Sequence, residues 1–125
     1  MSTEGAESKS TYDLHDRTTQ FSIKVIQLCK KAEKDVVSRP IISQLIRAAT
    51  SIGANYCEAD CAESRKDFEH KIGICKKESK ETMYWLRLLA ETIPAVEHES
   101  RELYCEAREL HLIFIAIVKK SRQNS

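Results

Sequence analysis

Apolar and small side chains recur along most of this chain at alternating spacings of four and three residues, and this repeat constrains the fold. The first series lies within residues 12–34 and consists of Leu14, Thr18, Phe21, Val25, Leu28 and Ala32. A repeat near 3.5 residues places these side chains on one side of an α-helix that packs along its neighbours. No segment shows the sustained two-residue alternation of a β-strand. The pattern therefore predicts an all-α fold.

Three further segments carry the same kind of series. In residues 40–61 it consists of Ile41, Leu45, Ala48, Ala49, Ile52, Tyr56 and Ala59. In residues 64–93 it consists of Phe68, Ile72, Cys75, Ser79, Leu86, Ala90 and Ile93. In residues 97–120 it consists of Leu103, Ala107, Leu110, Phe114 and Ile117. Four long helices with short connections predict an antiparallel up-down four-helix bundle.

Cap and breaker residues indicate where these helices begin. Ser38 is a candidate N-cap before Pro40, because a proline is tolerated in the first turn of a helix. Ser64 and Asp67 approximate a capping box at the start of the third helix. Gly53 leaves two interpretations of the second segment. One is a three-helix bundle in which this segment breaks, and the favoured one is a continuous helix that approaches a neighbour closely at Gly53.

The length of 125 residues suits a single domain with its own core. We expect a disordered tail over residues 1–11, the bundle over residues 12–120 and a C-terminal tail over residues 121–125. Five cysteines without a CxxC pair are typical of free thiols in a reducing cytoplasm. Residues 1–11 lack the apolar segment of a secretory signal, and the longest apolar run, residues 112–118, is too short to span a membrane. These features predict a cytoplasmic protein.

The second, third and fourth helices carry more apolar side chains than one buried face per helix can use. The fourth is apolar on nearly all sides over residues 112–118, and on the second and third helices the surplus consists of Ile42, Ile46, Ile74, Trp85 and Leu89. An exposed apolar patch of this kind usually marks an interface. We therefore expect a homo-oligomer with these residues at its interface. The alternative is that Trp85 only closes the edge of the core.

The sequence contains no arrangement that predicts catalysis or cofactor binding. Di-metal sites in helical bundles use Glu-x-x-His pairs, and none is present. Cys57 and Cys61 share a helical face, but no second ligand pair follows at zinc spacing. The chain also lacks a Gly-rich phosphate loop and a G-x-S-x-G motif, and nothing pairs Cys29 with a histidine as nucleophile and base. We expect no enzyme activity, no cofactor and no metal.

A basic stripe follows the third helix on the side opposite its apolar series. The candidate nucleic-acid-binding residues are Lys66, Lys77, Lys80 and Arg87. Such side chains can neutralise backbone phosphates. However, Glu69, Glu81 and Glu91 lie in or beside the same arc, so an ordinary solvated helix face is the alternative for any single lysine. The net charge of the whole chain is +1, which is not that of a strongly basic nucleic-acid binder.

Several stretches resemble a known family when they are taken together and in order. They are YDLHDRTTQF at residues 12–21, SIGANYCEA at 51–59, SRKDF at 64–68 and KESKETMYWLRLL at 77–89. From about residue 12 to residue 120 the chain resembles the four-helix bundle proteins encoded in intervening sequences of bacterial 23S rRNA genes.

The resemblance implies a bundle that assembles as a ring-like pentamer and has no known enzymatic activity. A related branch serves reverse transcriptases of diversity-generating retroelements as an accessory protein, whose basic pentamer binds nucleic acid and the transcriptase. The expected function is thus a non-catalytic oligomeric bundle that binds RNA, DNA or a nucleic-acid-processing protein such as a reverse transcriptase. The alternative is a protein-interaction scaffold that binds no nucleic acid. The present chain departs from the basic branch in its near-neutral charge.

Overall fold

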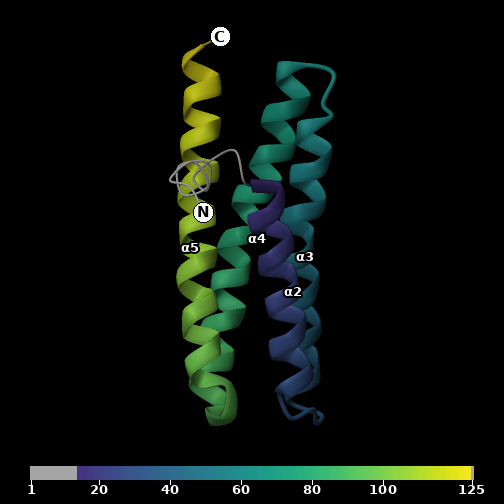
Figure 1. Cartoon of the computed structure of the whole chain (residues 1–125), viewed down its shortest axis with the longest axis vertical. Helices are drawn as coiled ribbons and strands as arrows, with labels where there is room; N and C mark the ends of the chain where they lie inside the picture. Colours follow the sequence, from purple (N-terminus) through teal and green to yellow (C-terminus); the bar gives the residue numbers. More distant parts are fainter. Residues whose placement is uncertain (1–13, 125) are drawn as a thin grey trace, which may run out of the picture.

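The computed structural model describes residues 14–124, which form four long α-helices arranged as an up-down bundle (Figure 1). The helices are α2 (Leu14–Lys31), α3 (Ser38–Asp60), α4 (Arg65–Thr92) and α5 (Glu97–Gln123). A short 3₁₀ turn, η1 (Pro94–Val96), joins α4 to α5. Residues 14–124 contain no β-strand. The predicted all-α four-helix fold is therefore confirmed, and the predicted tail over residues 1–11 lies outside the described residues.

Helices α3, α4 and α5 pack along much of their length, whereas α2 is shorter and makes few close backbone contacts with α5. In Figure 1 the C-terminal half of α5 rises beyond the start of α2. The bundle is consequently closed between α3 and α4 and between α4 and α5, and it opens between α2 and α5.

The core is built mainly from residues of the four apolar series. All six residues of the first series are buried, and the largest fully buried side chains of the other helices include Leu45, Ile52, Ile72, Leu86, Leu110 and Phe114. Helix α3 continues through Gly53, so the three-helix alternative is wrong. A Cβ atom at Gly53 would lie 3.4 Å from Thr18 Oγ1. Gly53 therefore marks the predicted close approach, here between α3 and α2.

The start of α3 differs from the prediction, because the cap comes from Asp35 rather than from Ser38. Asp35 Oδ1 accepts the backbone N–H groups of Val37 and Ser38 at 2.9 and 2.8 Å. In return, Ser38 Oγ accepts the backbone N–H of Asp35 at 3.0 Å. This reciprocal pairing satisfies donors that the helix leaves unpaired and lets α3 begin at Ser38, two residues before the predicted start.

The other helix ends agree more closely with the sequence. Ser64 Oγ accepts the backbone N–H of Asp67 at 3.0 Å, so the predicted N-cap of α4 is confirmed. Helix α5 extends to Gln123, and residues 121–123 are therefore helical, although they were assigned to a C-terminal tail. Two contacts with α4 hold this last turn. Ser121 Oγ donates to Glu69 Oε2 at 2.6 Å, and Arg65 Nη1 donates to the carbonyl of Asn124 at 2.8 Å.

Candidate nucleic-acid interface

The four predicted basic residues lie on the outer side of α4, and all four are exposed. From Lys66 to Arg87 they follow the helix for about 30 Å. Arg87 Nε contacts Glu91 Oε2 at 3.2 Å. Within residues 14–124, the side chains of Lys66, Lys77 and Lys80 form no hydrogen bond or ion pair. These three ammonium groups are thus open to an external anion.

The carboxylate of Glu81, which the sequence placed beside the stripe, is directed toward α3. Its Oε2 atom accepts the indole N–H of Trp85 at 2.9 Å and forms an ion pair with Arg47 of α3. The Trp85 hydrogen bond, together with Arg47, lowers the pKa of Glu81, so this side chain stays ionised. Arg47 Nη1 also contacts Glu78 Oε1 at 3.2 Å. Arg47 of α3 therefore compensates the negative charges of Glu78 and Glu81 on this side of α4.

Helix α5 extends the basic surface, and this contribution was missed in the sequence. Lys119 and Arg122 line a groove of about 330 Å³ with Lys76 of α4. Further along, Arg101 lines a groove of about 410 Å³ with Arg87. We call the residues on this side the α4–α5 basic face: Lys66, Lys76, Lys77, Lys80, Arg87, Arg101, Arg108, Lys119 and Arg122. The signal that could have revealed this contribution is the spacing of 7, 11 and 3 residues between Arg101, Arg108, Lys119 and Arg122. This spacing places the four side chains on one side of an α-helix.

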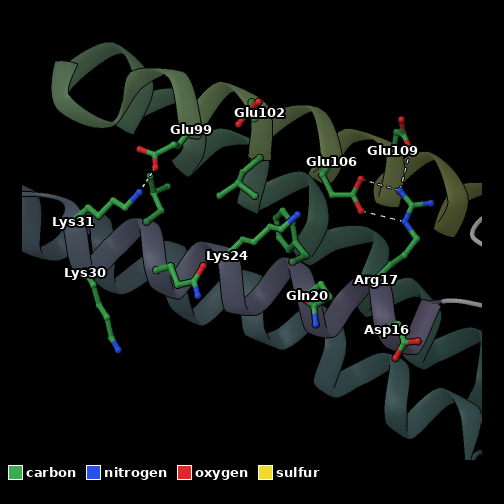
Figure 2. Close-up of a pocket in the computed structure, with 14 residues that line it drawn as sticks. Asp16, Arg17, Gln20, Lys24, Lys30, Lys31, Glu99, Glu102, Glu106 and Glu109 are labelled. Carbon is green, nitrogen blue, oxygen red and sulfur yellow. Dashed lines mark hydrogen bonds and ion pairs between the residues drawn. The ribbon is translucent and has the colours of Figure 1, made fainter.

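Acidic residues gather on the other side of α5, where it faces α2. They line a groove of about 1240 Å³ and are Glu99, Glu102, Glu106 and Glu109. Figure 2 shows Arg17 and Lys31 of α2 reaching across this groove. Arg17 Nη2 donates to Glu106 Oε1 and to Glu109 Oε1, each at 2.9 Å, and Lys31 forms an ion pair with Glu99. The hydrogen bond to Glu106 raises the pKa of Arg17.

The charges of α5 are therefore sorted between its two sides. Four of its glutamates, Glu99, Glu102, Glu106 and Glu109, face the basic residues of α2, whereas Arg101, Lys119 and Arg122 lie next to those of α4. Glu97 is the exception, because it forms an ion pair with Arg101 at 3.1 Å. A net charge of +1 conceals this separation, because opposite faces cancel in the sum. Local potential depends on the arrangement of charges as well as on their total.

The predicted interface residues divide into two groups. Ile42 and Leu89 are buried inside the single chain, because their side chains complete the core, so they offer no surface to a second copy. Ile46, Ile74 and Trp85 are half-buried. Further large apolar side chains are exposed: Ile23 and Ile26 on α2, Val36 and Val37 in the following loop, and Leu112 and Ile115 on α5. Of the predicted interface residues, Ile46, Ile74 and Trp85 are therefore still available to a second copy, and their place in an interface stays a prediction.

The described part of the chain shows no group of three or more His, Cys, Asp or Glu side chains that could hold a metal ion. Cys29 and Cys75 are buried, and burial raises the pKa of these thiols to about 11 and about 12. Cys57 lies beside His15 at the surface, outside the three grooves described above. None of the helices within residues 14–124 is long and apolar enough to cross a membrane.

Comparison with known proteins gives a family and a related structure. Residues 10–116 match the family described as 23S rRNA-intervening sequence protein. One similar solved structure is that of a protein of unknown function from the S23 ribosomal protein family of Bacteroides thetaiotaomicron. It is 33% identical, with a TM-score of 0.74, and the match covers 84% of the present chain and 97% of that chain. No curated protein matches.

Proposed function

The chain belongs to the 23S rRNA-intervening sequence protein family, and from this premise we propose that it is a non-catalytic helical scaffold that binds RNA or DNA through its α4–α5 basic face. The observation that carries the proposal is the separation of charge across α5. It leaves basic residues of α4 and α5 side by side, while Glu99, Glu102, Glu106 and Glu109 of α5 face α2.

The basic face suits a phosphate backbone better than a base edge. Its side chains, apart from the half-buried Lys76, are exposed and spread along two helices, and Lys66, Lys77 and Lys80 form no ion pair within residues 14–124. Each phosphate that such a residue neutralises releases condensed counterions, which supplies affinity without reading the sequence. Tyr84 lies in the same arc with its ring exposed, and it can stack on an unpaired base.

We further propose that several copies bind together. The resemblance favours a ring-like homopentamer, and the exposed apolar residues of α2 and α5 supply surface for contacts between copies. A cyclic ring uses a heterologous interface, in which one patch meets a different patch. Repetition of one weak basic face around such a ring raises the overall affinity through effective concentration. A reverse transcriptase or another nucleic-acid-processing protein is the partner that the resemblance suggests.

The second candidate function is a scaffold that binds only proteins. The observation that favours it is the exposure of Leu112 and Ile115 within the outer surface of α5. These side chains lie between the basic residues, so a protein partner could use the same surface. The two functions differ in their response to charge reversal and in whether a generic nucleic acid is bound at all.

Fluorescence anisotropy at low salt tests the proposal. The labelled ligands are RNA and DNA of about 20 nucleotides per strand, each in single-stranded and double-stranded form. The double variants Lys77→Glu/Lys80→Glu and Lys119→Glu/Arg122→Glu should each weaken binding by at least about tenfold, because phosphate contacts become repulsive. The matched control is Lys24→Glu/Lys30→Glu on α2, which changes the charge equally and should leave binding near that of the original chain. Absence of binding to all four ligands, or equal losses in all three variants, would refute a nucleic-acid function for this face.

A further inference from the structure

A thiol, an imidazole and a carboxylate lie in a row where α2 begins and α3 ends. Cys57 Sγ lies 3.9 Å from Nδ1 of His15, and the opposite ring nitrogen, Nε2, lies 3.0 Å from Oδ2 of Asp60. The His15 ring also packs edge-on against Tyr56, with 4.9 Å between the ring centroids. Three side chains of α3 thus hold the imidazole of α2 in one orientation.

The hydrogen bond to Asp60 sets the tautomer of His15. An ionised carboxylate only accepts hydrogen bonds, so the Nε2 atom must carry the hydrogen. The lone pair of Nδ1 then faces the thiol of Cys57 and can accept its proton. A nucleophile next to a base that a third group orients is the arrangement that activates a thiol.

Among the titratable groups that the structure describes near Cys57, within residues 14–124, His15 is the base that contacts the thiol. Tyr56 of α3 and Cys75 of α4 both have a pKa that burial raises, so both are neutral at neutral pH. Glu58 of α3 is paired with Lys71 of α4 at 2.6 Å. The side chain of Phe114, which α5 directs toward Tyr56, carries no charge. Cys57 itself is exposed, so small reagents can reach it.

We propose that Cys57 is an activated thiol that hydroperoxides oxidise to sulfenic acid, with His15 as its base and Asp60 as the residue that positions His15. The thiol proton passes to His15 Nδ1, and the thiolate sulfur attacks the terminal oxygen of the peroxide. The S–O bond forms as the O–O bond breaks, and the leaving oxygen takes the proton from His15. Cysteine is oxidised to sulfenic acid, and the peroxide is reduced to water or an alcohol.

The chain supplies internal controls for this reaction. Cys61 and Cys105 are also exposed, and neither contacts a histidine within residues 14–124. Proteolytic cleavage after Glu58 separates Cys57 from Cys61, so mass spectrometry can follow each thiol in its own peptide. Two reagents report different steps: iodoacetamide measures the nucleophilicity of each thiol, and hydrogen peroxide with dimedone traps sulfenic acid.

At pH 6.5 the full-length protein should be alkylated at Cys57 at least about tenfold faster than at Cys61 or Cys105, because the neighbouring imidazole can accept the proton of the Cys57 thiol during attack. Dimedone labelling after peroxide treatment should also concentrate at Cys57. His15→Gln should lower both signals at Cys57 to the level of Cys61 and leave Cys105 unchanged. Asp60→Asn should give an intermediate rate and move the pH profile of Cys57 alkylation toward that of Cys61, which a merely structural role would not do.

Circular dichroism of each variant checks that the fold is kept, which is expected because His15 and Asp60 are both about half exposed. Equal alkylation rates at the three exposed cysteines would overturn the proposal, as would a Cys57 rate that His15→Gln leaves unchanged. Fast alkylation of Cys57 without preferential dimedone labelling would contradict the proposal that hydroperoxides oxidise this thiol.

Discussion

At the residue scale, the basic face depends on where a few carboxylates point. Glu81 is adjacent to the stripe in sequence, yet its oxygen atoms are occupied by Trp85 and Arg47. Glu69 accepts a hydrogen bond from Ser121. Only Glu91 is paired with one of the four predicted basic residues, Arg87. The alternative of an ordinary solvated helix face is weakest for Lys66 and Lys80, because no carboxylate of the described residues forms an ion pair with them, whereas Lys77 still interacts electrostatically with Glu81.

The packing of single residues gives the first prediction. Leu86 is fully buried in the core, whereas Leu112 is 47% exposed on α5. Leu86→Ala should lower the free energy of unfolding by about 2–5 kcal/mol, because it removes buried methyl groups and leaves a cavity. Leu112→Ala makes the same chemical change at the surface and should have a much smaller effect. Urea denaturation followed by circular dichroism measures both, and similar losses would contradict the assignment of Leu86 to the core.

At the scale of the elements, α5 is the helix that separates the two surfaces. One of its sides supplies glutamates to α2, and another supplies arginines and lysines to the groove with α4. Charged contacts join α2 to α5, and among them Arg17 pairs with both Glu106 and Glu109. Its apolar series packs against the rest of the core.

The start of α3 gives a second prediction, which concerns pH. Backbone hydrogen bonds from Ser38 and Val37 lower the pKa of Asp35 in the folded chain. A carboxylate with a lowered pKa stabilises the fold above its unfolded pKa, and this contribution is lost as the pH falls through the folded value. Asp35→Ala should therefore lower the melting temperature more at pH 7 than at pH 3. Asp35→Asn should keep part of the cap without its pH dependence, and an Asp35→Ala effect that does not change with pH would contradict the capping role.

Much of the fold could be predicted because helix-forming patterns are local. The spacing of apolar residues located the core, and Ser64 located the start of α4. The cap by Asp35 was missed because its reciprocal bonds with Ser38 depend on the turn geometry before α3. Ile42 and Leu89 were placed at an interface because a helical wheel cannot tell how far a neighbouring helix wraps around a second apolar stripe.

The candidate site could be predicted only in part, for a different reason. Lys66, Lys77, Lys80 and Arg87 share one helix, so their common side follows from periodicity. The addition of Lys119 and Arg122 depends on the packing of α5 against α4, which brings them to Lys76. The contact between Cys57 and His15 likewise joins residues 42 positions apart in the sequence. Such long-range neighbours depend on how the helices pack, which a single helical period does not specify.

At the scale of the whole molecule, a basic face and exposed apolar residues occupy one small bundle. The resemblance favours a pentamer, and multi-angle light scattering at micromolar concentration should then give a mass of about five times 14.3 kDa. Trp85→Glu should dissociate this assembly while circular dichroism stays helical, because Trp85 is only half-buried within its own chain. A 14.3 kDa particle for the original chain would contradict assembly. Loss of helicity in the variant would place Trp85 in the core instead.

The salt dependence of nucleic-acid binding tests the central claim most directly, because it counts the phosphates that the basic face neutralises. We expect the logarithm of the association constant for double-stranded RNA to fall linearly with the logarithm of the salt concentration. Lys77→Glu/Lys80→Glu should make this slope shallower by about two, or by a multiple of that if several copies bind one duplex, since each lost phosphate contact removes about one. The control Lys24→Glu/Lys30→Glu should leave the slope unchanged. Binding with the same slope in all three proteins would show that the α4–α5 basic face does not contact the phosphates.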